Sequence, residues 1–503
     1  MELFVNARCY SFDAVQRRFR AYDSLLVDAG RIVALGEHPA GTGARRIDLE
    51  GATLLPAFAD CHVHLTDTGY FIGARDLASV RTYDDFAIAV SRLPNDGGVV
   101  FGGQYDDSGW RDGATADARP LERFHAGART MVTRIDGHSC LVNRTTLAWL
   151  RLPPETAGIE RNGDGEPTGK LVLDANWRAQ AAFLTAMPLK ARRDAERRAV
   201  EMALARGAVH LHAQLVGFER AAYAEEIASL KTLPAKIHPK VCEPDAALAM
   251  ELGLPYVGGD VFLDGSLGSR TAALVHPYCD DPGSGALRFS DDEVLGYFSQ
   301  AEALGIAAGV HAIGDAAIEQ CVRVWERVLA GKPSPRGCRH FIEHFELATQ
   351  EQIEACARMG IYLSMQPQFD ALWGGDGGMY EVRLGTERKR SMNALARIAR
   401  AGGVLCGGDD SPVCALDPLA GMQACVDHHE PGERFDAHQA LAMYTVDAAR
   451  LGYAESETGN LVLGLAADFV VLDRDPLDGA RFHDCRVLQT WIDGERVRSM
   501  AEI

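Results

Sequence analysis

Short apolar runs alternate with helical stretches of roughly 10 to 20 residues through most of this chain, and no other feature limits its fold as strongly. The alternation is typical of βα units built around a parallel sheet. We therefore predict an α/β fold with a (β/α)8 TIM-type barrel. Its core strands are expected near residues 53–61, 207–213, 235–242, 258–264, 305–311, 339–344, 360–366 and 403–409.

The two ends of the chain alternate apolar and polar residues between turn signals, which indicates β-strands. We predict a small β-sandwich domain built from residues 1–52 and 455–503, with the barrel over residues 53–454. The interval from about 70 to 195 is too long for one crossover between barrel strands. We expect there an inserted subdomain over the barrel mouth, with strand-like runs of its own at residues 99–102 and 130–133.

Charge and composition exclude several classes of protein. The chain has 51 Lys and Arg against 70 Asp and Glu, a net charge of −19, so we expect no nucleic-acid partner. A hydrophobic fraction of 47% and a charged fraction of 24% are typical of globular proteins. No apolar run approaches the ~18 residues of a membrane span, and the N-terminus is typical of a strand and not of a signal peptide. We expect a cytoplasmic protein without membrane contact.

The cysteines support the same location. All 12 are scattered singly, with no CxxC pair, so neither a disulfide framework nor a structural zinc knuckle is expected. The expected partner is a small-molecule substrate, and the sequence is compatible with a homodimer.

His62 and His64 form the strongest local signal for chemistry. In an extended strand, residues two apart point to the same side, so both imidazoles can meet at one divalent metal ion. The pattern alone also occurs in structural roles. Three further polar residues, His311, His344 and Asp410, each end or follow a predicted strand. Because active sites of such barrels lie at the carboxyl ends of the strands, the four places together predict a metal site.

Seven short runs also resemble known proteins: Pro56 to Leu65, Asp264 to Ala272, His311 to Ala316, Ile342 to His344, Ser364 to Pro367, Asp410 to Val413 and Ala467 to Leu472. In these runs the chain resembles members of the amidohydrolase superfamily. Within that superfamily it resembles the amidohydrolase-3 branch, which includes the YtcJ-like and N-substituted formamide deformylase group. The resemblance covers nearly the whole chain. It implies a metal-bearing barrel with a composite β-sandwich, and hydrolysis of carbon–nitrogen or ester bonds.

The resemblance also implies roles for single residues. His62 and His64 take the place of first-strand metal ligands, and His311 and His344 that of the fifth- and sixth-strand histidines. Asp410 takes the place of an aspartate that touches the metal or its water and shuttles a proton. His344 either binds a second metal ion or hydrogen-bonds the substrate in a one-metal site. Asp410 and His344 are thus the predicted catalytic residues.

One position departs from the family pattern. Members with two metal ions often place a lysine four residues before the Asp-Gly-Ser motif, where it can become carboxylated and bridge the ions, but this chain has Asp260 there. An aspartate can bind a metal ion but cannot reproduce a carbamate bridge. The resemblance therefore favours one divalent ion, Zn²⁺, over two. In the alternative reading, Asp260 is a strand-start residue paired with a cation.

Five residues are candidates for contact with substrate: His138, Trp110, Arg270, Gln366 and His212. For the first four the alternative is a loop-ordering role, and for His212 it is that of a hydrogen-bond donor behind the pocket wall. The predicted function is a metal-dependent hydrolase that uses activated water to cleave an amide, N-formyl or N-acyl bond of a small molecule. A metal-dependent deaminase or esterase is the alternative on the same scaffold. A metal-free binding protein is disfavoured, because it would have lost metal ligands that this chain retains.

Overall fold

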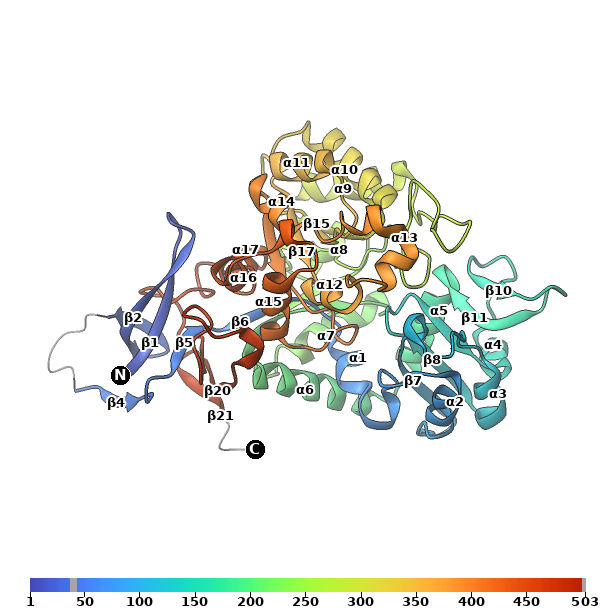
Figure 1. Cartoon of the computed structure of the whole chain (residues 1–503), viewed down its shortest axis with the longest axis horizontal. Coiled ribbons are helices and arrows are strands. Elements are labelled where there is room, and N and C mark those ends of the chain that lie inside the picture. Colours follow the sequence, from blue (N-terminus) through green and yellow to red (C-terminus); the bar gives the residue numbers. More distant parts are fainter. Residues whose placement is uncertain (37–42, 500–503) are drawn as a thin grey trace.

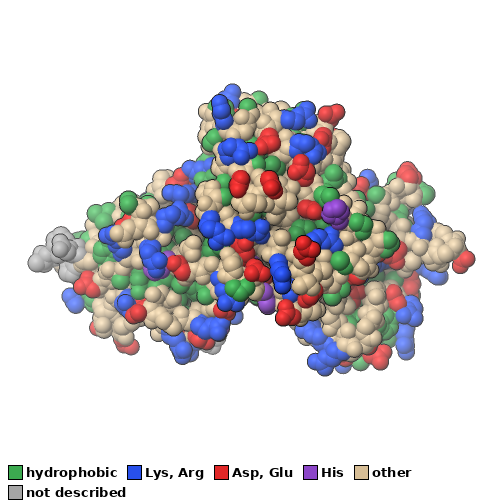
Figure 2. Space-filling model, turned by 45° about the horizontal axis from the view of Figure 1, so that its top comes forward, with side chains coloured by type: hydrophobic (Ala, Val, Ile, Leu, Met, Phe, Trp, Pro, Cys, Tyr) green, Lys and Arg blue, Asp and Glu red, His purple; other side chains and the backbone are tan. Residues whose placement is uncertain are grey.

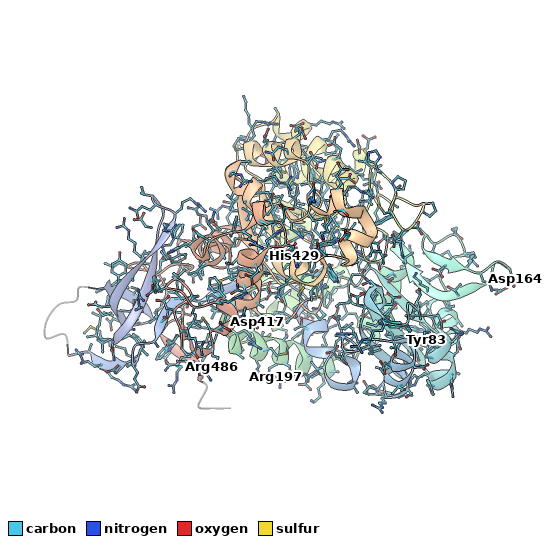
Figure 3. The ribbon with its side chains drawn as sticks, viewed as in Figure 1. Tyr83, Asp164, Arg197, Asp417, His429 and Arg486 are labelled. Atoms are coloured by element: carbon cyan, nitrogen blue, oxygen red, sulfur yellow. The ribbon has the colours of Figure 1, made fainter. Side chains whose placement is uncertain are left out.

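The computed structural model describes residues 1–36 and 43–499. Figure 1 shows a sheet from the chain ends on the left, parallel strands and helices in the centre, and the segment that contains β7 to β11 on the right. Figure 3 adds the side chains, which fill the space between the ribbons. Arg486 lies in the part formed by the chain ends, and Asp164 lies in the segment that contains β7 to β11. The predicted terminal domain includes 37–42 and 500–503, which lie outside the described residues.

The two ends of the chain form one mixed sheet, the terminal sheet, in the order β21-β20-β19-β5-β1-β2-β3, with β4 beside β1. The ring centroid of Phe4 on β1 lies 5.0 Å from those of Phe469 on β19 and Trp491 on β20. Neither strand is next to β1 in the sheet order, so these contacts indicate that the sheet curls. Its strands are β1 (Glu2–Asp13), β2 (Arg18–Asp28), β3 (Arg31–Leu35), β4 (Arg45–Asp48), β5 (Thr53–Pro56), β19 (Phe469–Leu472), β20 (Val487–Ile492) and β21 (Glu495–Ser499).

The centre holds parallel strands that are buried along most of their length, as expected for strands covered on both faces. They pair as two sheets, β13-β12-β6 and β14-β15-β16-β17-β18. Their bounds are β6 (Phe58–Val63), β12 (Ala208–Leu215), β13 (Lys236–Val241), β14 (Tyr256–Val257), β15 (Ala307–Ala312), β16 (Phe341–His344), β17 (Tyr362–Met365) and β18 (Val404–Gly407).

Only short contacts join these two sheets. At one seam, the Asp410 amide donates to the His62 carbonyl and the His64 amide to the Ser411 carbonyl, both at 2.8 Å. At the other, the Gly258 amide donates to the Val241 carbonyl at 2.8 Å. The pairing of the described strands is therefore not the unbroken barrel that the sequence predicts, although parallel strands alternate with helices as expected.

Two predicted strands need correction. The run 53–61 is continuous and apolar, but β5 pairs with β19 and β1 of the terminal sheet, so only β6 enters the centre. The run 258–264 is mostly irregular, and the strand β14 ends before it. Gly258 has a φ of 88° and Gly259 one of 107°, so the chain leaves the extended conformation there. A Cβ on Gly258 would lie 2.1 Å from the Gly309 carbonyl oxygen, which only glycine avoids.

The segment on the right of Figure 1, here called the insert, has its own sheet in the order β10-β11-β9-β8-β7. The strand-like runs predicted at 99–102 and 130–133 lie in β7 and β8. The insert contains β7 (Val99–Tyr105), β8 (Arg129–Arg134), β9 (Ser139–Val142), β10 (Ile159–Arg161), β11 (Pro167–Val172), α2 (Tyr83–Ser91), α3 (Arg119–His125), α4 (Arg144–Leu150) and α5 (Leu173–Ala186).

The remaining helices cover the parallel strands. Local signals define several of them: α9 begins with a Ser290–Glu293 capping box, and Gly305 ends it in a left-handed conformation. The helices are α1 (Leu65–Tyr70), α6 (Leu189–Ala205), α7 (Tyr223–Leu230), α8 (Ala246–Glu251), α9 (Asp291–Leu304), α10 (Asp315–Leu329), α11 (Gln350–Met359), α12 (Pro367–Trp373), α13 (Met379–Lys389), α14 (Leu395–Arg400), α15 (Pro418–Asp427), α16 (Ala437–Met443) and α17 (Val446–Leu451).

The surface and the helices agree with the composition. Basic and acidic side chains lie intermixed on the face in Figure 2. Among the described helices, none has the length and apolar character needed to cross a membrane. All 12 cysteines are free thiols, and most are buried.

Candidate functional site

The predicted metal ligands gather at one end of the parallel strands. His62 lies in β6, His311 in β15 and His344 at the end of β16, while His64 and Asp410 follow β6 and β18. Parallel strands end at a common edge, so residues far apart in sequence meet there. All are at least nine-tenths buried except His64, whose side chain is 21% exposed.

Two histidines and two aspartates converge on one point. His62 Nε2 lies 3.2 Å from Asp410 Oδ1 and 3.4 Å from Asp260 Oδ2. His64 Nε2 lies 3.1 Å from Asp410 Oδ1 and 3.2 Å from Asp260 Oδ2. Asp260, from the loop after β14, thus stands beside the histidines. It is not paired with Lys or Arg in the described residues, as the alternative reading required.

Several polar atoms of this group are buried without a hydrogen bond in the described part of the chain: His62 Nε2, Asp260 Oδ1, Asp410 Oδ1 and both ring nitrogens of His311. Buried polar atoms normally have partners, so such a cluster of lone pairs fits a divalent cation. His62, His344 and Asp410 also offer ligand atoms within 4.8 Å of one another. The rings of His311 and His344 lie 4.5 Å apart, beside this group.

The charges of the group indicate the same chemistry. Burial lowers the pKa of His64, but the carboxylates of Asp260 and Asp410 outweigh burial and raise that pKa to about 10. Burial lowers the pKa of His344 to about 3, and the neighbouring His311 and His62 add to the shift. The carboxylates therefore require positive charge between them, whereas His344 is a neutral imidazole with a free lone pair to offer.

Backbone strain also marks the site. His344 has a φ of 71° and Asp410 one of 51°, both in the left-handed region that side-chain-bearing residues rarely adopt. Such conformations cost free energy and persist where the surrounding structure holds them, which happens most often at functional sites. The side chains of both residues offer ligand atoms in the cluster.

A buried ion pair supports His62 from behind. His62 Nδ1 lies 2.9 Å from Glu343 Oε2, so the carboxylate holds the proton on Nδ1 and leaves Nε2 free to face the cluster. Lys240 Nζ donates to Glu343 Oε1 at 2.6 Å and to the Cys61 carbonyl at 2.9 Å. Burial alone would raise the pKa of Glu343, but Lys240 and His62 outweigh it and lower the pKa to about 2.

Sequence reasoning assigned no role to Glu343 or Lys240. The one available signal was that Glu343 directly precedes His344 on the same strand. Asp264 begins one of the resembling runs, and its carboxylate accepts from the amides of Ala273, Ile313 and Gly314. It thereby holds the loop that follows β15, the strand of His311.

Of the predicted substrate-binding residues, only His138 lines the cavity at the site. That cavity has a volume of about 400 Å³ and lies between the insert and the strand ends, with His64, His311, His344 and Asp410 in its wall. The His138 ring lies 5.0 Å from that of His311 and 5.1 Å from that of Trp177 on α5. Residues of the insert therefore form part of the cavity wall.

The other four predicted contacts lie outside the cavity wall. Gln366 Oε1 accepts from His344 Nδ1 at 2.7 Å, so it positions that histidine. Arg270 pairs with Asp280 at 2.7 Å and orders its loop.

His212 and Trp110 are core residues. His212 is buried and stacks on His238, with ring centroids 4.8 Å apart. Trp110 packs against Phe86 and Tyr105 inside the insert. Both residues belong to buried clusters, which a single sequence does not distinguish from pocket walls.

Comparisons with known proteins agree with this geometry. A model of the amidohydrolase family matches residues 45–498. The putative amidohydrolase YtcJ of Bacillus subtilis (strain 168) is 29% identical, and the match covers 94% of each chain. The N-substituted formamide deformylase of Arthrobacter pascens is 26% identical over 98% of this chain and 97% of its own. The crystal structure of an uncharacterized metal-dependent hydrolase from Pyrococcus furiosus has a TM-score of 0.73 and 25% identity, with 95% of this chain and 100% of that chain covered.

Proposed function

The chain belongs to the amidohydrolase family, and from this premise we propose that it is a metal-dependent hydrolase that cleaves a carbon–nitrogen bond of a small molecule. The bond would be an amide, N-formyl or N-acyl bond. The observation that carries the proposal is the convergence of His62, His64, Asp260 and Asp410 beside a cavity of substrate size. The activity in the name of the formamide deformylase relative supports the choice of bond.

The nitrogen and oxygen donors suit Zn²⁺, which proteins hold with histidine and carboxylate ligands. His62, His64, Asp260 and Asp410 would hold one ion. Such an ion supplies a Lewis acid that makes water a nucleophile near neutral pH and stabilises negative charge on the carbonyl oxygen. We further propose that the two parallel sheets act as one (β/α)8-type frame, which brings the strand ends together.

Asp410 is the proposed proton carrier. Its carboxylate accepts a proton as water attacks the carbonyl carbon, and it returns that proton to the nitrogen that leaves. Because Asp410 lines the cavity, it can reach both the water and the leaving nitrogen. His344, oriented by Gln366, hydrogen-bonds the substrate carbonyl or contributes a metal ligand.

A panel of N-acyl, N-formyl and cyclic amides, with esters and aminopurines alongside, tests the proposal on enzyme loaded with Zn²⁺. Turnover of amides with release of an amine is the expected result. Turnover of esters or of ring amines alone would replace the proposed bond by the esterase or deaminase alternative. No turnover of any compound, with metal bound, would remove the enzyme assignment.

Metal analysis of the purified protein is expected to return about one ion per chain, because Asp260 stands where a bridging carboxylated lysine would be needed for two. Atomic emission after dialysis against metal-free buffer measures this. Two well-occupied ions per chain would show that His311 and His344 complete a second site without a lysine.

Glu343→Gln is expected to weaken metal affinity by about 10- to 100-fold, because the loss of the carboxylate makes His62 a poorer ligand. The measurement is competition with a chromophoric chelator, which reports the metal Kd without an activity assay. Glu354→Gln on the exposed face of α11 is the matched control and should leave the Kd unchanged. An unchanged Kd for Glu343→Gln would mean that the Lys240–Glu343 pair only stabilises the fold.

A further inference from the structure

A second, much smaller cavity adjoins the site. It has a volume of about 30 Å³, and it shares His138, His311, His344 and Asp410 with the large cavity. By the space that one buried water needs, it holds about two groups of water size. A bond positioned at His344 and Asp410 would therefore have a large space on one side and a very small one on the other.

Packed apolar side chains form part of the wall of the small cavity. The ring centroids of Phe369 and Trp373 on α12 lie 5.1 Å apart, and those of Trp373 and Tyr380 lie 6.2 Å apart. The apolar side chains that line it are Leu267, Ile313, Phe369, Trp373, Met379 and Val413. These apolar side chains limit the size of the group that enters and offer it no hydrogen bonds.

Outside the proposed metal site, most polar groups in the lining are already satisfied by one another. Arg134 Nη1 donates to Asp136 Oδ2 at 2.6 Å, and Ser266 Oγ donates to the same oxygen at 2.8 Å. Glu346 is different. Tyr380 donates to Glu346 Oε2 at 2.6 Å, but Glu346 Oε1 has no hydrogen bond in the described part of the chain. The residue is only 3% exposed, so little of its surface is open to bulk water, and Glu346 lines the small cavity.

We propose that Glu346 is a specificity-determining residue that binds a hydroxyl or amino group on the smaller substituent of the scissile bond. This substituent has about two or three non-hydrogen atoms and enters the small cavity, while the bulky substituent enters the large one. In the large cavity, the bulky substituent would contact the stacked rings of Trp177 and Phe262, whose centroids lie 4.0 Å apart. Substrates are thus unequal amides with one short polar side, an inference that rests on the proposed function.

The chemistry of Glu346 suits either partner. A carboxylate accepts a hydrogen bond from a hydroxyl or an amine, and a neutral carboxyl group can also donate one. A methyl group in the same place would leave Oε1 unpaired. Sites that hydrogen-bond a substrate group reject analogues that lack it far more strongly than apolar pockets reject a change of size.

Two series of matched compounds test the inference. In the first, N-benzyl amides carry hydroxyacetyl, aminoacetyl, propionyl or acetyl groups. In the second, phenylacetamides carry 2-hydroxyethyl, 2-aminoethyl or propyl groups on nitrogen, which covers the reverse orientation. In at least one series, the polar compounds should exceed their apolar isosteres in kcat/KM by about tenfold or more.

Variants assign that preference to Glu346. Glu346→Leu should reduce the ratio to about one, and Glu346→Gln should retain most of it. Tyr380→Phe removes only the hydroxyl that holds the carboxyl group and should lower the ratio by about threefold, which keeps the test available if the leucine variant does not fold. Glu387→Leu, an exposed position on α13, is the matched control and should keep the wild-type ratio.

Binding separates this inference from the proposed function. Dissociation constants of the same compounds are measured by calorimetry on the metal-loaded protein. If no compound turns over but the Kd ratio depends on Glu346, the proposed function fails and the small-cavity assignment stands. If compounds turn over, yet wild type and Glu346→Leu have the same ratios, the inference is overturned. It is also overturned if neither turnover nor binding distinguishes polar from apolar members of both series.

Discussion

Asp410→Asn is expected to lower kcat by about 10²- to 10⁴-fold, the usual contribution of a positioned proton-transfer group. The asparagine side chain has nearly the shape of the aspartate side chain. The left-handed backbone at position 410 and the hydrogen bond from its backbone N–H to the His62 carbonyl should therefore persist. An amide cannot take up the proton of the attacking water. The assay is steady-state kinetics with excess metal, since the variant also loses a charged ligand, and thermal unfolding should be nearly unchanged.

Asp409→Asn is the control for that prediction. Asp409 points away from the cluster, since its carboxylate accepts from Gln368 Nε2 at 2.9 Å and from the Asp417 amide at 2.7 Å. Asp417, labelled in Figure 3, is the N-cap residue of the helix α15. We expect this variant to keep most of its turnover and to lose some thermal stability. An inactive Asp409 variant beside an active Asp410 variant would show that the assignment of proton transfer to Asp410 is wrong.

Removal of the metal is expected to abolish activity, and added Zn²⁺, Mn²⁺ or Co²⁺ to restore it. Without an ion, the carboxylates of Asp260 and Asp410 face two histidines that take up protons, so no activated nucleophile is available. Chelation, dialysis and titration with each metal measure this. The melting temperature should rise with free metal concentration, because an ion that binds only the folded chain stabilises it.

Full activity of metal-stripped protein would contradict the mechanism. A melting temperature that does not respond to metal, together with unchanged activity, would exclude a metal site at this cluster. A response of the melting temperature without recovery of activity would instead separate metal binding from catalysis. Circular dichroism of the stripped protein shows whether it remains folded during the assay.

Several parts of the site could be predicted from the chain alone. His62 and His64 are two apart in a strand, a spacing that directs both side chains to one side whatever else the fold does. His311, His344 and Asp410 end or follow apolar runs, and parallel strands end at one edge. Asp260 was identified by counting back from Asp264, although the strand predicted around it is absent.

The supporting residues required the fold. Lys240, Glu343 and His62 come from β13, β16 and β6, and their contacts depend on which side chains face the interior between two sheets. Glu346 is likewise an ordinary acidic residue in sequence, and only its position beside Tyr380 and the small cavity makes it distinctive.

Local periodicity and residue type, read from the sequence by itself, determined the α/β alternation, the two strand-rich ends, the strands of the insert and the residues that end the central strands. Those features depend on neighbours a few residues apart. The tertiary structure decided that β5 joins the terminal sheet, that the central strands pair as two sheets, and that Trp110, His212 and Arg270 lie away from the cavity. These outcomes depend on contacts between residues far apart in the chain, whose free energies no local pattern records.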